Sequence, residues 1–234
     1  MRSTNPRALR DPPNGIVSAS VPVFRVHHVR HLDHSTYVLR FDRHGFQFEP
    51  GQYVNLGVQG SIAMREYSIY SGAGDDFLEV LVREIEGGLV SRALGRCQPG
   101  DALSVQGPYG HFLTDPRERS SSLYLFIGTG TGVSPFHCLV RSYPDLEYLV
   151  LHGIRTDKER CDNGAFDSSR YVSCVTRSGG GDFRGRVTQY LRENPVDPAC
   201  LCYLCGNSDM IYEAYALLRG QGVPLDHLRA EIYF

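Results

Sequence analysis

The sequence predicts two domains, an antiparallel β-barrel followed by a parallel α/β domain. Up to residue 116, short runs of alternating apolar and polar residues are separated by turn residues, which is typical of small antiparallel barrels or sandwiches. From residue 123 on, nearly continuous apolar runs alternate with helical segments, which indicates a parallel sheet covered on both faces. We therefore divide the chain into a flexible tail (1–18), a barrel (19–116), a linker (117–122) and an α/β domain (123–234).

The individual strands and helices are predicted from hydrophobic periodicity and turn residues. In the barrel we expect strands at 23–29, 36–41, 52–58, 67–71, 77–85 and 102–107. One helix is expected at 89–97, between the pair Gly87-Gly88 and the pair Pro99-Gly100. In the α/β domain we expect strands at 123–128, 147–154, 171–177 and 200–206, and helices at 134–143, 184–194 and 208–222.

Composition and charge limit the class of protein. The 41% hydrophobic and 21% charged content is ordinary for a soluble globular protein. The formal net charge of −2 argues against a general nucleic-acid binder. No apolar run approaches the roughly 18 residues that a membrane span needs. The N-terminal stretch has three arginines but no apolar core, so we expect a polar tail or a short organellar presequence, not a secretory signal.

The cysteines and histidines predict no metal site. Seven cysteines without the spacing of a disulfide framework favour a reducing cytoplasm, and we expect a cytoplasmic monomer. Cys200, Cys202 and Cys205 cluster, but they lack a fourth ligand and the usual zinc or iron–sulfur spacing. A histidine metal site at His27, His28, His31 and His34 is disfavoured as well, because His27 and His28 face opposite sides of a strand.

A glycine-rich turn, GTGTGVSP (128–135), follows the first expected strand of the parallel sheet. Glycines let the backbone approach a ligand without a Cβ in the way, and Pro135 suits the first turn of a helix. A pyrophosphate would sit on the N–H groups at the positive end of that helix. The stretch departs from the G-x-G-x-x-G fingerprint, so a structural turn without a ligand is the alternative.

A second candidate site is REYSIYS (65–71), on an expected barrel strand. Arg65 can pair with a phosphate, and Tyr67 offers a flat ring to a flat cofactor. Ser68 presents its hydroxyl to the opposite face of the strand. The alternative is a surface arginine beside a half-buried tyrosine, but GGLVS (87–91) favours a ligand, because this second helix N-terminus could hold the same phosphates.

Seven short motifs follow one another along the chain: PGQYV (50–54), REYS (65–68), GGLVS (87–91), GPYG (107–110), GTGTGVSP (128–135), CGNSDM (205–210) and EIYF (231–234). Together they resemble the ferredoxin–NADP reductase family, in its bacterial ferredoxin/flavodoxin–NADP reductase form. The resemblance runs from about residue 20 to residue 234. It implies an N-terminal FAD-binding antiparallel β-barrel and a C-terminal NADP(H)-binding parallel α/β domain, in agreement with the division above.

The resemblance also implies an FAD site. Arg65 and the GGLVS segment would hold the pyrophosphate, Tyr67 would lie against the isoalloxazine, and Tyr233 or Phe234 would stack on the flavin. A docked hydrophobic tail is the alternative for the last two. The implied FAD contacts are Arg65, Tyr67, Ser68, Ile69, Val82, Gly88, Leu89, Val90, Ser91, Tyr233 and Phe234.

Three residues are implied to be catalytic. Ser68 would lie near flavin N5, Cys205 beside the nicotinamide, and Glu231 would be a carboxylate for proton supply or electrostatics. A strand-end core cysteine is the alternative for Cys205.

The implied NADP(H) contacts lie on the glycine-rich turn and at later strand ends. Arginines would accommodate the 2′-phosphate that distinguishes NADP from NAD, and plain surface arginines are the alternative, because arginine is abundant here. These contacts are Gly130, Thr131, Gly132, Arg155, Thr176, Arg177, Arg186, Cys205, Gly206 and Met210.

The implied function is that of an FAD-dependent oxidoreductase. It would exchange hydride with NADP(H) and single electrons with a separate ferredoxin or flavodoxin. Two alternatives keep the fold, namely the reductase component of an oxygenase and a flavin reductase. A non-catalytic electron-transfer subunit is less favoured, because the sequence has no cysteine-rich cluster segment at its C-terminus.

Overall fold

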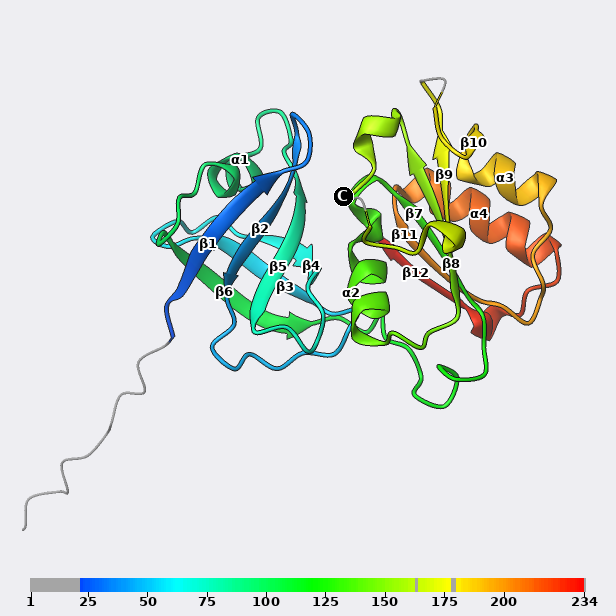
Figure 1. Cartoon of the computed structure of the whole chain (residues 1–234), viewed down its shortest axis with the longest axis horizontal. Helices are drawn as coiled ribbons and strands as arrows, with labels where there is room; N and C mark the ends of the chain where they lie inside the picture. Colours follow the sequence, from blue (N-terminus) through cyan, green and yellow to red (C-terminus); the bar gives the residue numbers. More distant parts are fainter. Residues whose placement is uncertain (1–21, 163, 178–179, 234) are drawn as a thin grey trace, which may run out of the picture.

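The computed structural model describes residues 22–162, 164–177 and 180–233. These residues form two domains that lie side by side, with helix α2 (Ser134–Ser142) between the two sheets (Figure 1). The predicted fold class, an antiparallel barrel followed by a parallel α/β domain, is confirmed. The predicted tail at 1–18 lies outside the described residues. The linker expected at 117–122 falls between the two sheets, and its limits remain a prediction.

The first sheet has six antiparallel strands in the order β4-β3-β6-β1-β2-β5. A bridge between Ile69 and Val80 joins the chain after β4 to β5, so the two edges of the sheet meet as in a barrel. Helix α1 (Leu89–Gly95) adds Val90 and Leu94 to the barrel core. The strands are β1 (Phe24–His31), β2 (Thr36–Asp42), β3 (Tyr53–Val58), β4 (Arg65–Ser68), β5 (Phe77–Arg83) and β6 (Ala102–Tyr109).

The second sheet is parallel throughout, in the order β10-β9-β8-β7-β11-β12. Helix α2 covers the face toward the barrel, and α3 (Val187–Glu193) and α4 (Ser208–Gly220) cover the other face (Figure 1). With both faces covered, β11 is buried along its whole length. The strands are β7 (Tyr124–Thr129), β8 (Tyr148–Ile154), β9 (Tyr171–Val175), β10 (Phe183–Arg184), β11 (Leu201–Gly206) and β12 (Leu228–Ile232). Short 3₁₀ turns are η1 (Gly130–Val133), η2 (Asp157–Glu159), η3 (Ser168–Arg170) and η4 (Leu225–His227).

Three elements differ from the sequence prediction. The strand expected at 67–71 ends at Ser68, because the chain there leaves β3 and continues beside β5. The helix expected at 184–194 begins later, at Val187, because Arg184 belongs to strand β10. Strand β12 was not predicted; its sequence LRAEI alternates apolar and polar residues over only five positions, and it forms through parallel pairing with β11.

Apolar and polar contacts hold the two domains together. Val38 and Leu81 of the barrel belong to the same buried cluster as Phe126 and Phe136 of the α/β domain. Tyr70 belongs to this cluster as well, and its ring stacks on the imidazole of His137, with centroids 3.8 Å apart.

Hydrogen bonds complete the interface. The Tyr70 hydroxyl donates to Asp162 Oδ2 at 3.0 Å, and Arg30 donates two hydrogen bonds to the same carboxylate. His137 Nδ1 donates to the carbonyl oxygen of Tyr70 at 2.7 Å. Because these buried polar groups are paired, the domains have a defined relative position. In the described ranges, no helix has the length and hydropathy to cross a bilayer.

Candidate active site between the two domains

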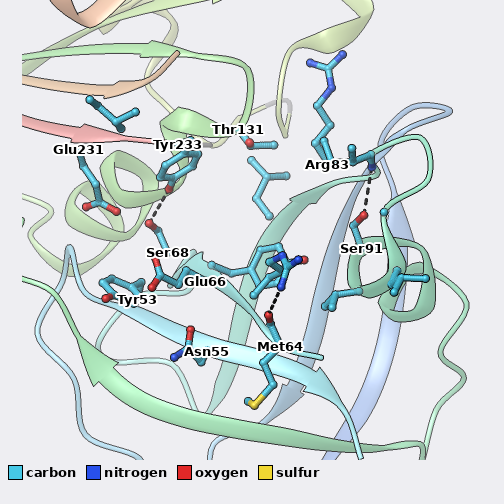
Figure 2. Close-up of a pocket in the computed structure, with 18 residues that line it drawn as sticks. Tyr53, Asn55, Met64, Glu66, Ser68, Arg83, Ser91, Thr131, Glu231 and Tyr233 are labelled. Atoms are coloured by element: carbon cyan, nitrogen blue, oxygen red, sulfur yellow. Dashed lines mark hydrogen bonds between the residues drawn. The ribbon is translucent and has the colours of Figure 1, made fainter. Parts of the chain in front are cut away.

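A cleft of about 750 Å³ opens where the barrel meets the carboxyl end of the parallel sheet (Figure 2). This volume is in the range of small-molecule and cofactor sites, about 300–1,000 Å³. The barrel contributes β3, β4, β5 and the start of α1, and the α/β domain contributes η1 and β12. The lining residues are Tyr53, Asn55, Met64, Arg65, Glu66, Tyr67, Ser68, Leu81, Arg83, Ile85, Gly88, Leu89, Val90, Ser91, Thr131, Glu231, Ile232 and Tyr233.

The start of α1 presents backbone donors to this cleft. Gly88 is the N-cap residue, and no side chain of the described residues caps the first N–H groups of the helix, which stay available to an acceptor. A Cβ on Gly88 would lie 2.8 Å from Ser91 Oγ, so a side chain there would disturb the turn. Ser91 Oγ is itself oriented by a 3.1 Å hydrogen bond from the N–H of Ile85. The exposed Arg65 adds positive charge to the same cleft.

Ser68 and Tyr233 meet in the cleft although they are 165 positions apart in the chain. The Tyr233 hydroxyl donates to Ser68 Oγ at 2.5 Å, and Figure 2 shows the two side chains pointing toward one another. The N–H of Tyr233 donates to the carbonyl oxygen of Gly206 at 2.9 Å. The tyrosine is therefore fixed at the end of β11, between the two domains.

Glu231 is a carboxyl group of the cleft whose pKa is raised toward neutral pH. Burial, and then the nearby Glu66 carboxylate, raise the pKa of Glu231 to about 7, although a hydrogen bond with Ser68 opposes the shift. A carboxyl group with such a pKa can take up or release a proton near neutral pH.

Replacing Glu231 with glutamine should stabilise the protein at alkaline pH. The pKa of Glu231 rises from 4.5 to about 7 on folding, so the folded state binds the proton more tightly than the unfolded state. The stability that this group contributes is therefore present below 4.5 and is lost as the pH rises through about 7. Thermal unfolding should show a higher Tm for Glu231→Gln than for the wild type at about pH 8, with the difference closing toward about pH 4.5.

The matched control is Glu86→Gln, at an exposed position near the same cleft. It should shift the Tm little at any pH. A Glu231→Gln difference that is the same at both pH values would contradict the raised pKa.

The glycine-rich loop after β7 packs directly against the end of β11. Gly130 has φ +54° and opens η1. A Cβ on Gly132 would lie 2.4 Å from the carbonyl oxygen of Cys205, and one on Gly206, where φ is +123°, would lie 2.5 Å from Thr129 Oγ1. The absence of these side chains permits a close approach of the two strand ends, and it brings Thr131 to the cleft.

The predicted nucleotide-binding arginines lie at neighbouring strand ends. Arg155 follows β8 and Arg177 follows β9, and the N–H of Arg177 donates to the carbonyl oxygen of Arg155 at 2.8 Å. Arg186 is the N-cap residue of α3, and Thr176 is exposed beside Arg177. Within the described residues, none of the three guanidinium groups forms an ion pair.

Several predicted contacts do not line the cleft. The side chains of Ile69 and Val82 belong to the barrel core, because alternation along β5 turns Leu81 and Arg83 toward the cleft instead. Gly130, Gly132 and Gly206 are not among the lining residues, whereas Thr131 and Tyr233 are. Cys205 and Met210 are buried in the apolar clusters on the two faces of the parallel sheet. Phe234 lies outside the described residues.

Arg83 is the cleft residue whose omission from the prediction matters most. It is only partly exposed, and its Nη1 atom lies 3.6 Å from where a Cβ on Gly130 would stand. The guanidinium group of Arg83, on the barrel, therefore lies next to the glycine-rich loop of the α/β domain. The sequence prediction placed Val82 in the site, and a period of two along β5 then turns Arg83 away, so only the observed orientation of Leu81 and Arg83 reveals this contact.

An antiparallel barrel and a parallel α/β sheet share one cleft, whose volume and lining are those of a cofactor-binding site between two domains. Residues 23–113 match the family described as oxidoreductase FAD-binding domain. Over 220 residues the chain is 34% identical to ferredoxin–NADP reductase B of Sorangium cellulosum (strain So ce56), covering 83% of this chain and 88% of the relative. The chain belongs to the ferredoxin–NADP reductase family.

Two further proteins are similar to this chain, one in sequence and one in fold. The chain is 32% identical to the toluate 1,2-dioxygenase electron transfer component of Pseudomonas putida over 215 residues, which is 85% of this chain but only 63% of that relative. A ferredoxin NADP⁺ reductase from Neisseria gonorrhoeae, solved with bound FAD and NADP, has a similar fold, with a TM-score of 0.82 at 20% identity. That likeness covers 91% of this chain and 98% of the other.

Proposed function

We propose that this protein is an FAD-dependent NADP(H) oxidoreductase that exchanges electrons with a separate ferredoxin or flavodoxin. The observation that carries the proposal is the shared cleft, in which Ser68 of the barrel meets Glu231 and Tyr233 of the α/β domain. Reaction between two cofactors requires their reactive rings to be in contact. A cleft built from both domains is the place where a barrel-bound flavin and a sheet-bound nicotinamide can meet.

The residues of the cleft fit FAD. The uncapped start of α1 and the exposed Arg65 offer donors and positive charge to a pyrophosphate. Gly88 keeps this end open, since a Cβ there would meet Ser91 Oγ at 2.8 Å. Tyr67 supplies an aromatic ring, half-buried in the cleft, for a planar group.

When bound, FAD would supply the redox chemistry, taking two electrons with a hydride from NADPH and passing them on singly. The chain's own residues would hold and release protons and would control the entry of water and of the nicotinamide ring into the cleft. Glu231 would hold or release a proton at its carboxyl group, and the Ser68 hydroxyl, which contacts both Glu231 and Tyr233, would connect that proton to the cleft. Tyr233 would exclude water until the nicotinamide ring takes its place.

The coenzyme preference is proposed from three arginines that form no ion pair with any described residue. Arg155, Arg177 and Arg186 stand at the carboxyl end of the sheet, where nucleotides bind in open α/β folds. A 2′-phosphate carries charge that a ribose hydroxyl lacks, so a cluster of unpaired guanidinium groups favours NADP(H) over NAD(H).

The test is an anaerobic titration of the purified protein, followed by the flavin absorbance, with NADPH and separately with NADH. We expect a yellow protein that NADPH bleaches faster than NADH. Arg177→Ala should raise the KM for NADPH about tenfold, on the order of 1.4 kcal/mol, and leave that for NADH nearly unchanged. Arg192→Ala is the control, because Arg192 lies on α3 and is paired with Glu213. A colourless protein that takes up no added FAD would contradict the proposal.

The reductase component of an oxygenase is the second candidate for the acceptor. It is favoured by the 32% identity to the toluate 1,2-dioxygenase component. Comparing the turnover of a [2Fe–2S] ferredoxin from an oxygenase system with that of a flavodoxin separates the two candidates. Faster reduction of the oxygenase ferredoxin, together with a preference for NADH, would favour the second.

A further inference from the structure

A fully buried histidine lies directly beneath the glycine-rich loop. His152 is in the middle of the parallel sheet, on β8, opposite Gly128 of β7 and Ser173 of β9. Its Nε2 atom is 2.8 Å from the carbonyl oxygen of Gly130, and its Nδ1 atom is 2.7 Å from the hydroxyl of Tyr171. Both ring nitrogens are thus engaged, one of them with the loop itself.

The chemistry of these partners fixes the tautomer. A carbonyl oxygen can only accept, so Nε2 carries the proton and donates it to Gly130. Nδ1 then accepts from the Tyr171 hydroxyl. Burial lowers the pKa of His152 to about 4, although the hydrogen bond to Gly130 opposes the shift. The imidazole is therefore neutral at physiological pH, and both hydrogen bonds form with the neutral ring.

This hydrogen bond restrains one peptide of the loop, at the first residue of η1. Gly130 has φ +54°, and a glycine has many accessible backbone conformations, so an unanchored peptide here could rotate. In a trans peptide the C=O and the following N–H point in opposite directions. Drawing the Gly130 oxygen toward β8 therefore turns the N–H of Thr131 away from the sheet, and Thr131 lines the cleft.

We propose that His152, oriented by Tyr171, is a positioning residue that holds the peptide between Gly130 and Thr131 so that the Thr131 N–H faces a phosphate of the bound dinucleotide. The inference rests on the proposed NADP(H)-binding function and names the residues that prepare its phosphate site. A donor that is already oriented binds without the cost of ordering the loop. The alternative is a buried histidine that is satisfied and serves the fold alone.

The test uses the FAD-loaded full chain and three variants. His152→Phe fills the space but cannot donate to Gly130, whereas the amide of His152→Gln can still donate to it. Tyr171→Phe removes the donor to Nδ1. Three quantities are measured: the Kd for NADP⁺ from the flavin difference spectrum, the amide hydrogen exchange of residues 130–133 without nucleotide, and the Tm.

We expect His152→Phe to raise the Kd about tenfold and to speed amide exchange in the loop, with Tyr171→Phe shifting both in the same direction by less. His152→Gln should recover most of the affinity, and kcat with saturating NADPH should change less than KM. A lower Tm with unchanged Kd and unchanged loop exchange in His152→Phe would overturn the inference and leave a structural histidine. If the wild type itself binds no NADP⁺, the proposed function fails as well, and the two failures are therefore distinguishable.

Discussion

Replacing Gly132 with alanine should destabilise the fold by about 2 kcal/mol, the middle of the range for overpacking a tight site. A Cβ at this position would lie 2.4 Å from the carbonyl oxygen and 2.7 Å from the carbonyl carbon of Cys205, and 2.9 Å from the Cα of Gly206. All three atoms are backbone, so no side chain can rotate away. Either the glycine-rich loop or the end of β11 must shift. Chemical unfolding of the FAD-loaded protein, with unchanged m-value, measures the effect.

Gly220→Ala is the matched control. Gly220 is in helix α4, and nothing lies within 4 Å of a Cβ added there. Alanine has the higher helix propensity, so this variant should be as stable as the wild type or more stable, by up to about 1 kcal/mol. Equal stability of Gly132→Ala and Gly220→Ala would mean that the two strand ends separate easily. We also expect Gly132→Ala to bind NADP⁺ more weakly, because Thr131 is the next residue of the loop and lines the cleft.

Replacing Tyr233 with alanine should tighten the binding of NADP⁺ by about tenfold, on the order of 1.4 kcal/mol. The Tyr233 ring occupies the junction between the barrel and β11, held by its hydroxyl on Ser68 and its N–H on Gly206. A nicotinamide ring that enters this junction must displace the tyrosine and break its 2.5 Å hydrogen bond. Removing the ring removes that cost. Difference spectra of the flavin with NADP⁺ measure the change, and deletion of Tyr233 together with Phe234 should act in the same direction.

Tyr233→Phe separates the effect of the aromatic ring on NADP⁺ affinity from the effect of its hydrogen bond to Ser68. It keeps the ring but cannot donate to Ser68 Oγ, so it should show only a small part of the gain in affinity. Both variants should keep their far-UV circular dichroism, because most of the apolar cluster that Tyr233 contacts lies within the sheet and α2. Unchanged NADP⁺ affinity in both variants and in the deletion would mean that the C-terminal residues do not cover the nicotinamide position.

The candidate site could be predicted in part. Arg65, Tyr67, Ser68 and the 88–91 segment were found because glycine, arginine and aromatic residues stand in short motifs, and all of them line the cleft. Ile69 and Val82 were assigned to the same site, yet their side chains are in the barrel core. Their position depends on which face of a strand points inward, and a chain that passes from β3 to β5 at Ile69 changes its neighbours there.

The sequence by itself determined the order of most elements, the change from antiparallel to parallel organisation, and the position of the glycine-rich turn after the first parallel strand. These features follow from periodicity and backbone sterics over a few neighbouring residues. The tertiary structure decided which distant groups meet: Ser68 with Tyr233, Arg83 with the loop at Gly130, and His152 with the Gly130 carbonyl.

The packing of the two domains also decided the chemistry of the site. Glu231 is an ordinary carboxylate in the sequence, and its burial at the junction, followed by the nearby Glu66 carboxylate, raises its pKa to about 7. The burial of Glu231 and its distance from Glu66 depend on residues far apart in the chain, so only the folded structure determines this pKa.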